Sequence, residues 1–381
     1  ATLCNVTSSQ IEITCMSAPG TGRDLRGIVK LAGQLSPPST ASLQYNAPTI
    51  SSAFGTLTST HGNSSMTLVG HGFGPTGGAV VSVMYGPAGD ESRYTATGCS
   101  VTVADSAISC TSVSGVGGNL IFAVTISSQS SNNFTSSVSY PPPTISDASY
   151  ASNSAGFSTS GSASYVRLRG SNFGPVTPVG TYVHGSYGPA SSSSRFSLPS
   201  TSCNVSVAHV EIICDVGEGY GGDFSWNITV ESQSVANVFS SSLGYKVPEI
   251  TGVSTNAPNN LMPTDGSDTL TFVGSNFGPI GSPVFATIGS VTSLGNVTRL
   301  DSCSVTQAHT QIRCAGSAGI GVDLRFRMSV SDQYSSMSSV GLSYLGPQIT
   351  EFRSSTTPSA SVAPVLSTQG GTIVLIRGEN F

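Results

Sequence analysis

The chain has 381 residues, a formal net charge of −5, and only 9% charged residues. No run of Lys or Arg occurs, so the chain lacks the basic footprint of a nucleic-acid-binding protein, and no apolar stretch approaches the 18 residues of a membrane span. Ser, Thr and Gly dominate, with scattered β-branched residues and no long helical pattern, which predicts an all-β fold.

Four cysteine pairs share one internal spacing and recur every 95 to 104 residues: Cys4/Cys15, Cys99/Cys110, Cys203/Cys214 and Cys303/Cys314. Such self-similarity predicts an array of one repeated module. Three whole modules are expected, at 48–142, 143–247 and 248–346. Residues 1–47 correspond to the later part of a module and residues 347–381 to the beginning of another.

Each module is expected to begin at a Pro-x-Ile sequence and to end at a Tyr. The starts are Pro48-Thr49-Ile50, Pro143-Thr144-Ile145, Pro248-Glu249-Ile250 and Pro347-Gln348-Ile349, and the closing residues are Tyr45, Tyr140, Tyr245 and Tyr344. Each Tyr precedes the next Pro by three positions. A two-residue linker beside the fixed φ of proline restricts the angle between neighbours, so a stiff array is predicted.

A Gly-rich corner follows the early strand of each module. It runs through 68–75, 168–175 and 272–279 and recurs at 378–381, with the pattern Gly-Ser-Asn-Phe-Gly-Pro in the second and third cases. Gly and Asn accept positive φ and Gly-Pro ends a strand ladder, so the segment is predicted to be a structural corner with its Phe in the core. The first corner differs, since His71 and Gly72 replace Ser-Asn.

The cysteine segments fix their own geometry. Counting from the first Cys, a Val lies at +2, an Ile at +9 and the second Cys at +11, so a hairpin places Cys opposite Cys and Val opposite Ile on one face. A non-hydrogen-bonded antiparallel pair has Cα atoms about 4.5 Å apart, near the short end of the disulfide range. We therefore expect one hairpin disulfide per module, with reduced core thiols as the alternative. The spacing is not that of a zinc site.

After the second Cys comes a second Gly-rich turn and an alternating strand such as 224–230, whose apolar residues, Trp226 among them, are expected to face the core. Short strands separated by turn signals predict β-sandwiches. Together the Pro-x-Ile start, the corner, the Cys hairpin, the Gly-x-Gly turn and the closing Tyr resemble the IPT/TIG family of immunoglobulin-like domains. The resemblance implies immunoglobulin-like sandwiches, and in extracellular proteins it implies receptor ectodomains, adhesins and surface arrays.

Six Asn-x-Ser/Thr sequons suggest N-glycosylation, at Asn5, Asn63, Asn133, Asn204, Asn227 and Asn296. Five have an apolar middle residue, which in a strand puts the Asn and its Ser or Thr on the solvent face. Paired cysteines and sequons together predict an extracellular or cell-surface protein. Covalent glycans are expected, and no cofactor.

No pattern points to catalysis, so no enzyme activity, catalytic residue or metal site is expected. Two Gly-x-Gly-x-x-Gly matches, at 72–77 and 217–222, lie in repeated turns and open no helix, which argues against nucleotide binding. No Gly-x-Ser-x-Gly elbow and no calcium loop occurs. His209 and His309 occupy the same offset in the Cys hairpin and are expected to be solvated turn residues.

Three classes of function remain open. The first is structural, a stiff glycosylated extracellular rod or filament, either a window on a longer array or a subunit that associates head to tail with its own kind. The second is an adhesin or receptor ectodomain that binds a cell-surface protein or a glycan, which predicts one module with an exposed aromatic or charged patch unlike its siblings. A non-catalytic appendage of a secreted carbohydrate-active enzyme is a third class.

Overall fold

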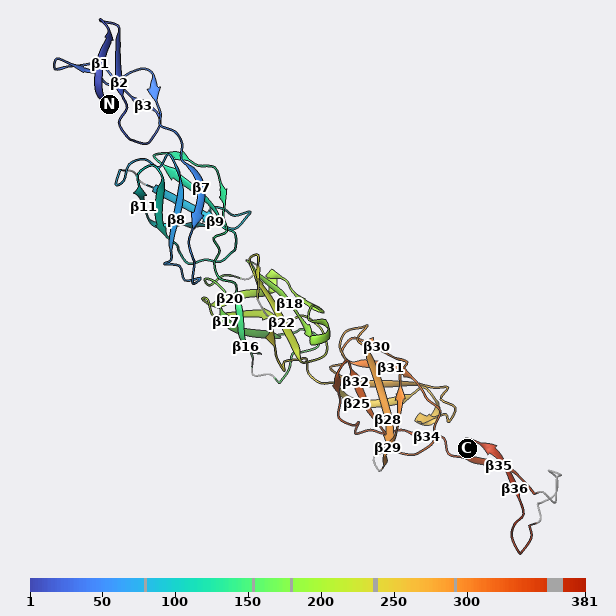
Figure 1. Cartoon of the computed structure of the whole chain (residues 1–381). Helices are drawn as coiled ribbons and strands as arrows, with labels where there is room; N and C mark the ends of the chain where they lie inside the picture. Colours follow the sequence, from blue (N-terminus) through green and yellow to red (C-terminus); the bar gives the residue numbers. More distant parts are fainter. Residues whose placement is uncertain (79–80, 153–154, 179–180, 236–238, 291–292, 355–365) are drawn as a thin grey trace.

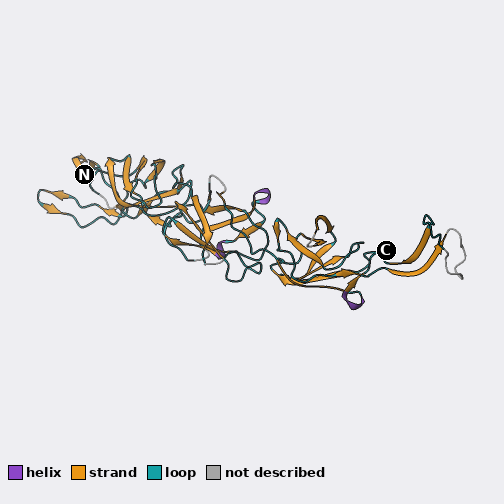
Figure 2. Cartoon of the chain, turned by 90° about the horizontal axis from the view of Figure 1, so that it is seen from below, coloured by secondary structure: helices purple, strands orange, loops and turns teal. Residues whose placement is uncertain are grey.

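The computed structural model describes residues 1–78, 81–152, 155–178, 181–235, 239–290, 293–354 and 366–381. Within these ranges the regular structure is strand, apart from three single 3-10 turns, η1 (Ala190–Ser192), η2 (Ser200–Ser202) and η3 (Pro258–Asn260). Figures 1 and 2 show the strands gathered into successive bodies, with the N-terminal and C-terminal segments at opposite ends of the array. The all-β prediction is confirmed.

Three of these bodies are two-layer sandwiches, called A, B and C here. Sandwich A pairs the sheet β11-β12-β8-β7 with the sheet β10-β9-β13-β14, to which β15 is added beside β13. Its strands are β7 (Thr49–Phe54), β8 (Ser65–His71), β9 (Val81–Gly86), β10 (Tyr94–Thr95), β11 (Thr97–Val103), β12 (Ala107–Thr111), β13 (Ile121–Ile126), β14 (Gln129–Ser130) and β15 (Phe134–Thr135).

Sandwich B repeats this plan with the sheets β16-β17-β21-β20 and β19-β18-β22-β23, and β24 beside β22. Its strands are β16 (Thr144–Tyr150), β17 (Tyr165–Ser171), β18 (Val183–Pro189), β19 (Phe196–Leu198), β20 (Cys203–Val207), β21 (Glu211–Asp215), β22 (Phe224–Val230), β23 (Gln233–Ser234) and β24 (Phe239–Ser240).

Sandwich C has the sheets β25-β27-β31-β30 and β29-β28-β32-β33, and a parallel pair β26-β34. Its strands are β25 (Glu249–Thr255), β26 (Leu261–Met262), β27 (Thr269–Ser275), β28 (Val284–Ser290), β29 (Ser293–Leu300), β30 (Cys303–Gln307), β31 (Gln311–Ala315), β32 (Leu324–Val330), β33 (Gln333–Tyr334) and β34 (Ser343–Tyr344).

The segments before sandwich A and after sandwich C are smaller. The first contains the pairs β1 (Thr2–Ser8) with β2 (Glu12–Met16), β3 (Leu25–Arg26) with β6 (Ser42–Leu43), and β4 (Lys30–Leu31) with β5 (Gln34–Leu35). The last contains the hairpin of β35 (Gln348–Ser354) and β36 (Val374–Glu379).

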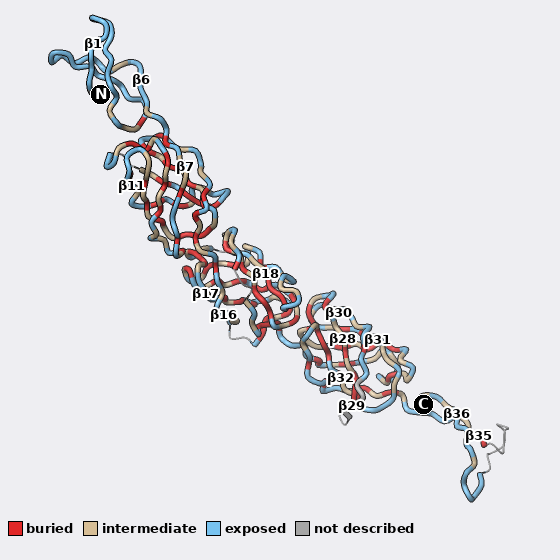
Figure 3. The backbone as a smooth tube through the Cα atoms, viewed as in Figure 1, coloured by how far each residue is buried: buried red, intermediate tan, exposed pale blue. Residues whose placement is uncertain are grey.

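Each sandwich is held together by one apolar core between its sheets. In β13 every second residue, Phe122, Val124 and Ile126, is fully buried, and these side chains belong to the same cluster as Leu68 and Ile108 of the opposite sheet. Burial of apolar area at about 25 cal/mol per Å² is the main stabilising contribution. Trp226 lies fully buried in the core of sandwich B, as its strand phase predicted. Figure 3 shows the buried residues in three separate groups.

The predicted cysteine hairpins are present in all four copies. The disulfides join Cys4 to Cys15, Cys99 to Cys110, Cys203 to Cys214 and Cys303 to Cys314, with Cα atoms 4.0 to 4.2 Å apart. The strand register places Val205 opposite Ile212 and Val305 opposite Ile312, as the offsets required. The disulfide prediction is confirmed, and the reduced-thiol alternative is wrong for this structure.

The Gly-rich corners share one conformation despite their different sequences. Asn172 and Asn276 have φ of 66° and 63°, and Gly72, which stands at the same position in sandwich A, has φ of 78°. This left-handed region is open to Gly and tolerated by Asn. The departure of the first corner from the Ser-Asn pattern therefore keeps the same backbone.

Candidate functional site: the junctions between sandwiches

The closing tyrosine of each repeat is fastened inside its own sandwich. In all four copies its hydroxyl donates a hydrogen bond of 2.5 to 2.8 Å to the carbonyl three residues after the second Cys: Tyr45 to Ala18, Tyr140 to Val113, Tyr245 to Gly217 and Tyr344 to Ser317. The phenol therefore ties the end of each repeat to the turn that follows its Cys hairpin.

The Gly-rich turn of each repeat makes room for this ring. A Cβ added at Gly219 would lie 2.5 Å from the hydroxyl oxygen of Tyr245. Because real Cβ contacts of that length do not occur, only glycine fits there. The segment 217–222 lies between β21 and β22 and opens no helix. Gly219 in this segment is thus accounted for by packing against Tyr245.

Sandwiches A and B contain a second buried tyrosine. The hydroxyl of Tyr85 lies 2.9 Å from that of Tyr140, and the hydroxyl of Tyr187 lies 2.6 Å from that of Tyr245. In sandwich C the strand register places Ile288 where Tyr187 stands in B. The sequence Tyr-Gly-Pro occurs at Tyr85 and at Tyr187 and is absent at Ile288. Sandwich C therefore lacks the tyrosine pair.

The main chain of the closing tyrosine is bound by the next sandwich along the chain. A glutamine that begins the short strand β14, β23 or β33 of that sandwich donates from Nε2 to the tyrosine carbonyl: Gln129 to Tyr45 at 2.9 Å, Gln233 to Tyr140 at 2.8 Å, and Gln333 to Tyr245 at 2.7 Å. At the first junction the same amide also accepts from the Gly22 N–H, at 3.2 Å. We call this repeated contact the glutamine clasp.

A second contact at two junctions comes from the turn of the Cys hairpin. His209 of sandwich B has its Nδ1 2.8 Å from Thr60 Oγ1 of sandwich A, and His309 of sandwich C has its Nδ1 3.1 Å from Thr159 Oγ1 of sandwich B. Only 7% of the His209 surface is exposed. The expectation that these histidines are solvated is wrong, because their hairpin turn packs against the preceding sandwich.

His209 also lies against another imidazole. The ring of His61 stacks on it with centroids 3.8 Å apart. Burial, and then the charge of His61, hold the pKa of His209 below its ordinary value. The geometry therefore favours a neutral His209 in the assembled junction.

A third contact involves the position two residues before the clasp glutamine, in the turn between β13 and β14 or between β22 and β23. Ser127 Oγ lies 2.9 Å from Thr21 Oγ1 at the first junction, and at the A–B junction Glu231, which holds the same place, forms an ion pair with Arg93. The corner glycine approaches the preceding sandwich too, since a Cβ at Gly174 would lie 2.4 Å from Val116 Cγ1. At each of these junctions the two adjoining repeats therefore contact each other at several separate points.

The sequons occupy different environments. Asn5, Asn63 and Asn133 are exposed, and Asn204 and Asn227 are half-buried. In β20 and β22 the middle residues Val205 and Ile228 are buried, so the predicted strand phase holds there. In β1 the middle residue, Val6, is 59% exposed. Asn296 lies in β29, and its side chain is outside the described residues.

In the described ranges no three His, Cys, Asp or Glu side chains are grouped closely enough to hold a metal ion. The same ranges contain no helix with the length and apolarity needed to cross a bilayer.

Comparison with known proteins gives structural likenesses only. No family model and no curated protein matches the chain. Solved structures that match include a protein crystallised with a xylogluco-oligosaccharide (16% identity, TM-score 0.30, covering 80% of this chain and 62% of that one), an Escherichia coli adhesin (15%, 0.21, 79% and 96%), and invasin, a bacterial integrin-binding protein (12%, 0.22, 82% and 62%). The chain spans less than two thirds of the first and third of these.

Proposed function

We propose that this chain is a segment of a stiff extracellular rod or filament, a structural glycoprotein built from tandem sandwiches of the IPT/TIG type. The single observation that carries the proposal is the glutamine clasp, which recurs at three successive junctions with distances within 0.2 Å of one another. A flexible string of domains needs no such contact, because a Gly/Ser linker suffices. A repeated, specific contact instead supports a fixed angle between neighbours.

The chemistry of the junction supports rigidity. Each clasp replaces a water-exposed amide and carbonyl by a direct hydrogen bond, which contributes about 1 kcal/mol net. The Tyr that accepts it is itself fixed by its hydroxyl, so the clasp joins two ordered bodies. Bending a junction requires the clasp and the hairpin-turn contacts to break together.

The two surfaces of a junction differ, which bears on partners. The preceding sandwich contributes its tyrosine carbonyl and Gly-rich turn, and the following one contributes the glutamine and the Cys hairpin turn. Such a head-to-tail contact is of the heterologous kind that generates lengthening assemblies. The partner that fits either surface is another repeat of this array, in the same chain or in an associated one.

The compartment follows from the cysteines. All eight cysteines form disulfides, and disulfides of this kind persist in oxidising surroundings. The exposed sequons in the same chain support N-glycans, which add solubility to a surface with few charges. An extracellular or cell-surface location is therefore proposed.

Negative-stain microscopy together with small-angle X-ray scattering tests the rod. Straight particles whose sandwiches keep one spacing and angle are expected, at both low and high ionic strength. Particles that bend freely at the junctions in a wide range of angles would show that the clasps do not stiffen the chain, and the structural proposal would then be wrong.

Treatment with peptide N-glycosidase followed by peptide mass spectrometry tests the glycans. Conversion of Asn to Asp is expected at the exposed Asn5, Asn63 and Asn133 in protein from its native source. Unmodified asparagine at all three positions would contradict the glycoprotein proposal and leave the rod untouched.

A further inference from the structure

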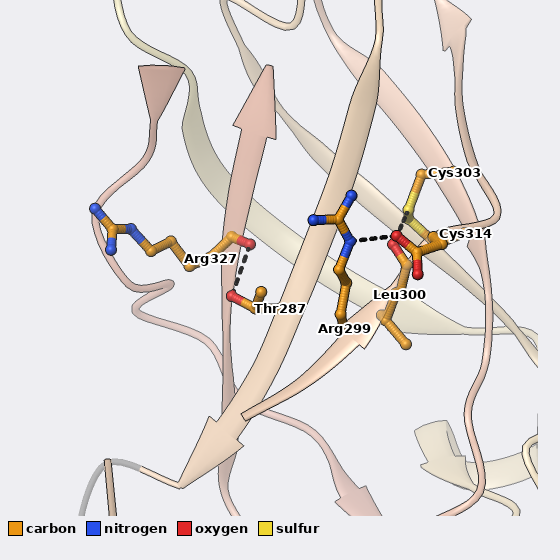
Figure 4. Close-up of a disulfide and its surroundings, with 7 residues drawn as sticks. Thr287, Arg299, Leu300, Cys303, Cys314 and Arg327 are labelled. Carbon is orange, nitrogen blue, oxygen red and sulfur yellow. Dashed lines mark hydrogen bonds and ion pairs between the residues drawn. A yellow bond between two sulfur atoms is a disulfide. The ribbon is translucent and has the colours of Figure 1, made fainter. Parts of the chain in front are cut away.

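The outer face of one sheet of sandwich C differs from the equivalent faces of its siblings. Across β29, β28 and β32, Arg299, Thr287 and Arg327 lie side by side in the strand register. In the neighbouring row Phe285, Ser329 and Tyr334 lie opposite one another across β28, β32 and β33. Figure 4 shows Arg299 and Arg327 on either side of Thr287.

The four large side chains form one exposed stack. The guanidinium carbon of Arg299 lies 3.6 Å from the centre of the Phe285 ring, Phe285 meets Tyr334 edge to face at 6.2 Å, and the guanidinium carbon of Arg327 lies 4.8 Å from the centre of Tyr334. Tyr334 is 48% exposed. We call this set the Arg–aromatic ladder.

Sandwiches A and B do not carry the ladder. The same register positions hold Ser82 and His184 in place of Phe285, Ala123 and Asn227 in place of Arg327, Ser130 and Ser234 in place of Tyr334, and Thr95 and Ser197 in place of Arg299. Ser, Thr and Ala there are small, and Asn227 begins a sequon. Packing of the common fold therefore does not require the ladder, since two siblings fold without it.

We propose that the Arg–aromatic ladder is a docking site for an acidic polysaccharide, one with carboxylate or sulfate groups along a chain of sugar rings. The planar guanidinium forks of arginine match carboxylate and sulfate oxygens, and aromatic side chains pack against the apolar faces of sugar rings. Arg299 is paired with the carboxylate of Asp301, whereas among the described residues Arg327 has no carboxylate partner and its Nε donates to the carbonyl of Ser335. The remainder of its guanidinium is free to bind an anion.

Charge also indicates the path of such a ligand. Beside Tyr334 lies a groove of about 720 Å³ between sandwiches B and C, and its lining includes three carboxylates, Asp223, Glu249 and Asp332, against one cation, Lys246. These carboxylates repel an anionic polymer from the groove. The ligand is therefore expected to run over the sheet, along the ladder.

Binding of the full chain to immobilised polygalacturonate and dextran sulfate, with neutral dextran as the reference, tests the proposal. The native chain is expected to bind both acidic polymers and to release them as salt screens the charges. The double variant Arg299→Gln/Arg327→Gln is expected to bind about tenfold more weakly. Arg313→Gln removes a charge from the opposite sheet of sandwich C and is expected to leave binding unchanged.

The aromatic contribution is tested by returning the sites to the residues of sandwich A. Phe285→Ser and Tyr334→Ser change no charge and are each expected to weaken binding several-fold, with the unfolding temperature as a control for folding. Transplanting the ladder into sandwich A through the four substitutions S82F, T95R, A123R and S130Y is expected to create a second site on the chain. The proposal would be overturned if Arg313→Gln and Arg327→Gln weakened binding to the acidic polymers equally. It would also be overturned if the native chain bound neither acidic polymer, or bound only acidic proteins.

Discussion

The closing tyrosine is bound in two directions by two different parts of one residue. In Tyr245 the hydroxyl donates within sandwich B to Gly217, while the carbonyl accepts from Gln333 of sandwich C. Its backbone N–H also donates to the carbonyl of Gly221. A single residue is thus hydrogen-bonded both within its own sandwich and to the next one.

Replacing Tyr245 by Phe is expected to destabilise sandwich B by about 1 to 3 kcal/mol. The substitution removes the hydroxyl that hydrogen-bonds both the Gly217 carbonyl and the buried Tyr187 hydroxyl, so both groups lose that partner. Tyr344→Phe is the matched control, since it removes only the bond to Ser317. Its expected cost is smaller. Denaturant unfolding of both variants measures the difference, and equal costs would contradict a role for the tyrosine pair.

The A–B junction is expected to weaken in mild acid. Burial lowers the pKa of His209 in the assembled junction, so a protonated imidazole favours separation of the two sandwiches. The contact has its full strength above about pH 6.5, the value of an exposed imidazole, and loses strength as the pH falls below it. Hydrogen exchange of the amides around Thr60 and His209 from pH 7.5 to pH 5 reports the change.

His209→Asn is the control for this titration, since Asn tolerates the positive φ of that turn and does not titrate. The variant is expected to show no pH dependence of exchange at the junction beyond the intrinsic chemistry. A junction that responds to acid equally in both proteins would rule out His209 as the group responsible.

At the scale of the element, the Cys hairpin serves two purposes. Its strands carry the disulfide and contribute core residues such as Val205 and Ile212, and its turn reaches the preceding sandwich through His209. The turn residue has φ of 67°, which sets the side chain beyond the sheet edge. The disulfide therefore stabilises a hairpin that contributes both to the core of sandwich B and to its junction with sandwich A.

Removing one disulfide, as Cys303→Ala with Cys314→Ala, is expected to cost sandwich C about 2 to 3 kcal/mol by the chain-entropy estimate for an 11-residue loop. Amide exchange should accelerate in β30 and β31. The equivalent strands β20 and β21 of sandwich B retain their disulfide and are the internal control. Unchanged protection in β30 would contradict the stabilising role.

Much of the fold could be predicted from the sequence because it depends on local patterns. The Val and Ile offsets fixed the hairpin register, alternation placed Trp226 inside, and the turn chemistry located the corners. The glutamine clasp was missed, although Gln129, Gln233 and Gln333 each stand three residues after the last apolar residue of a core strand. Their partners lie 84 to 93 residues away, and no local pattern indicates such a pairing.

At the scale of the whole molecule, the arrangement depends on junctions that are similar in design and different in detail. The three junctions that lead up to sandwich C each have the clasp, while the accompanying contact is Thr21 with Ser127 at the first, Arg93 with Glu231 at the second, and His309 near Glu218 at the third. Figure 1 shows the resulting extended succession of sandwiches.

Substituting Gln233 by Ala is expected to loosen the A–B junction by about 1 kcal/mol, and the triple change that includes Gln129 and Gln333 is expected to loosen all three. Small-angle scattering should show a broader distribution of end-to-end distances with each added change. Gln34→Ala, at an exposed position in the β4–β5 hairpin away from the junction contacts, is the control. Identical scattering from the native and triple-variant chains would show that the clasps do not set the angle.

Because every junction draws one set of groups from the sandwich before it and another from the sandwich after it, each complete repeat carries both halves of the contact. A gene duplication that copies one whole repeat therefore inserts a domain whose two ends already carry the contact residues for the repeats before and after it. Chain length can then change in evolution by whole repeats, with no new surface to be invented.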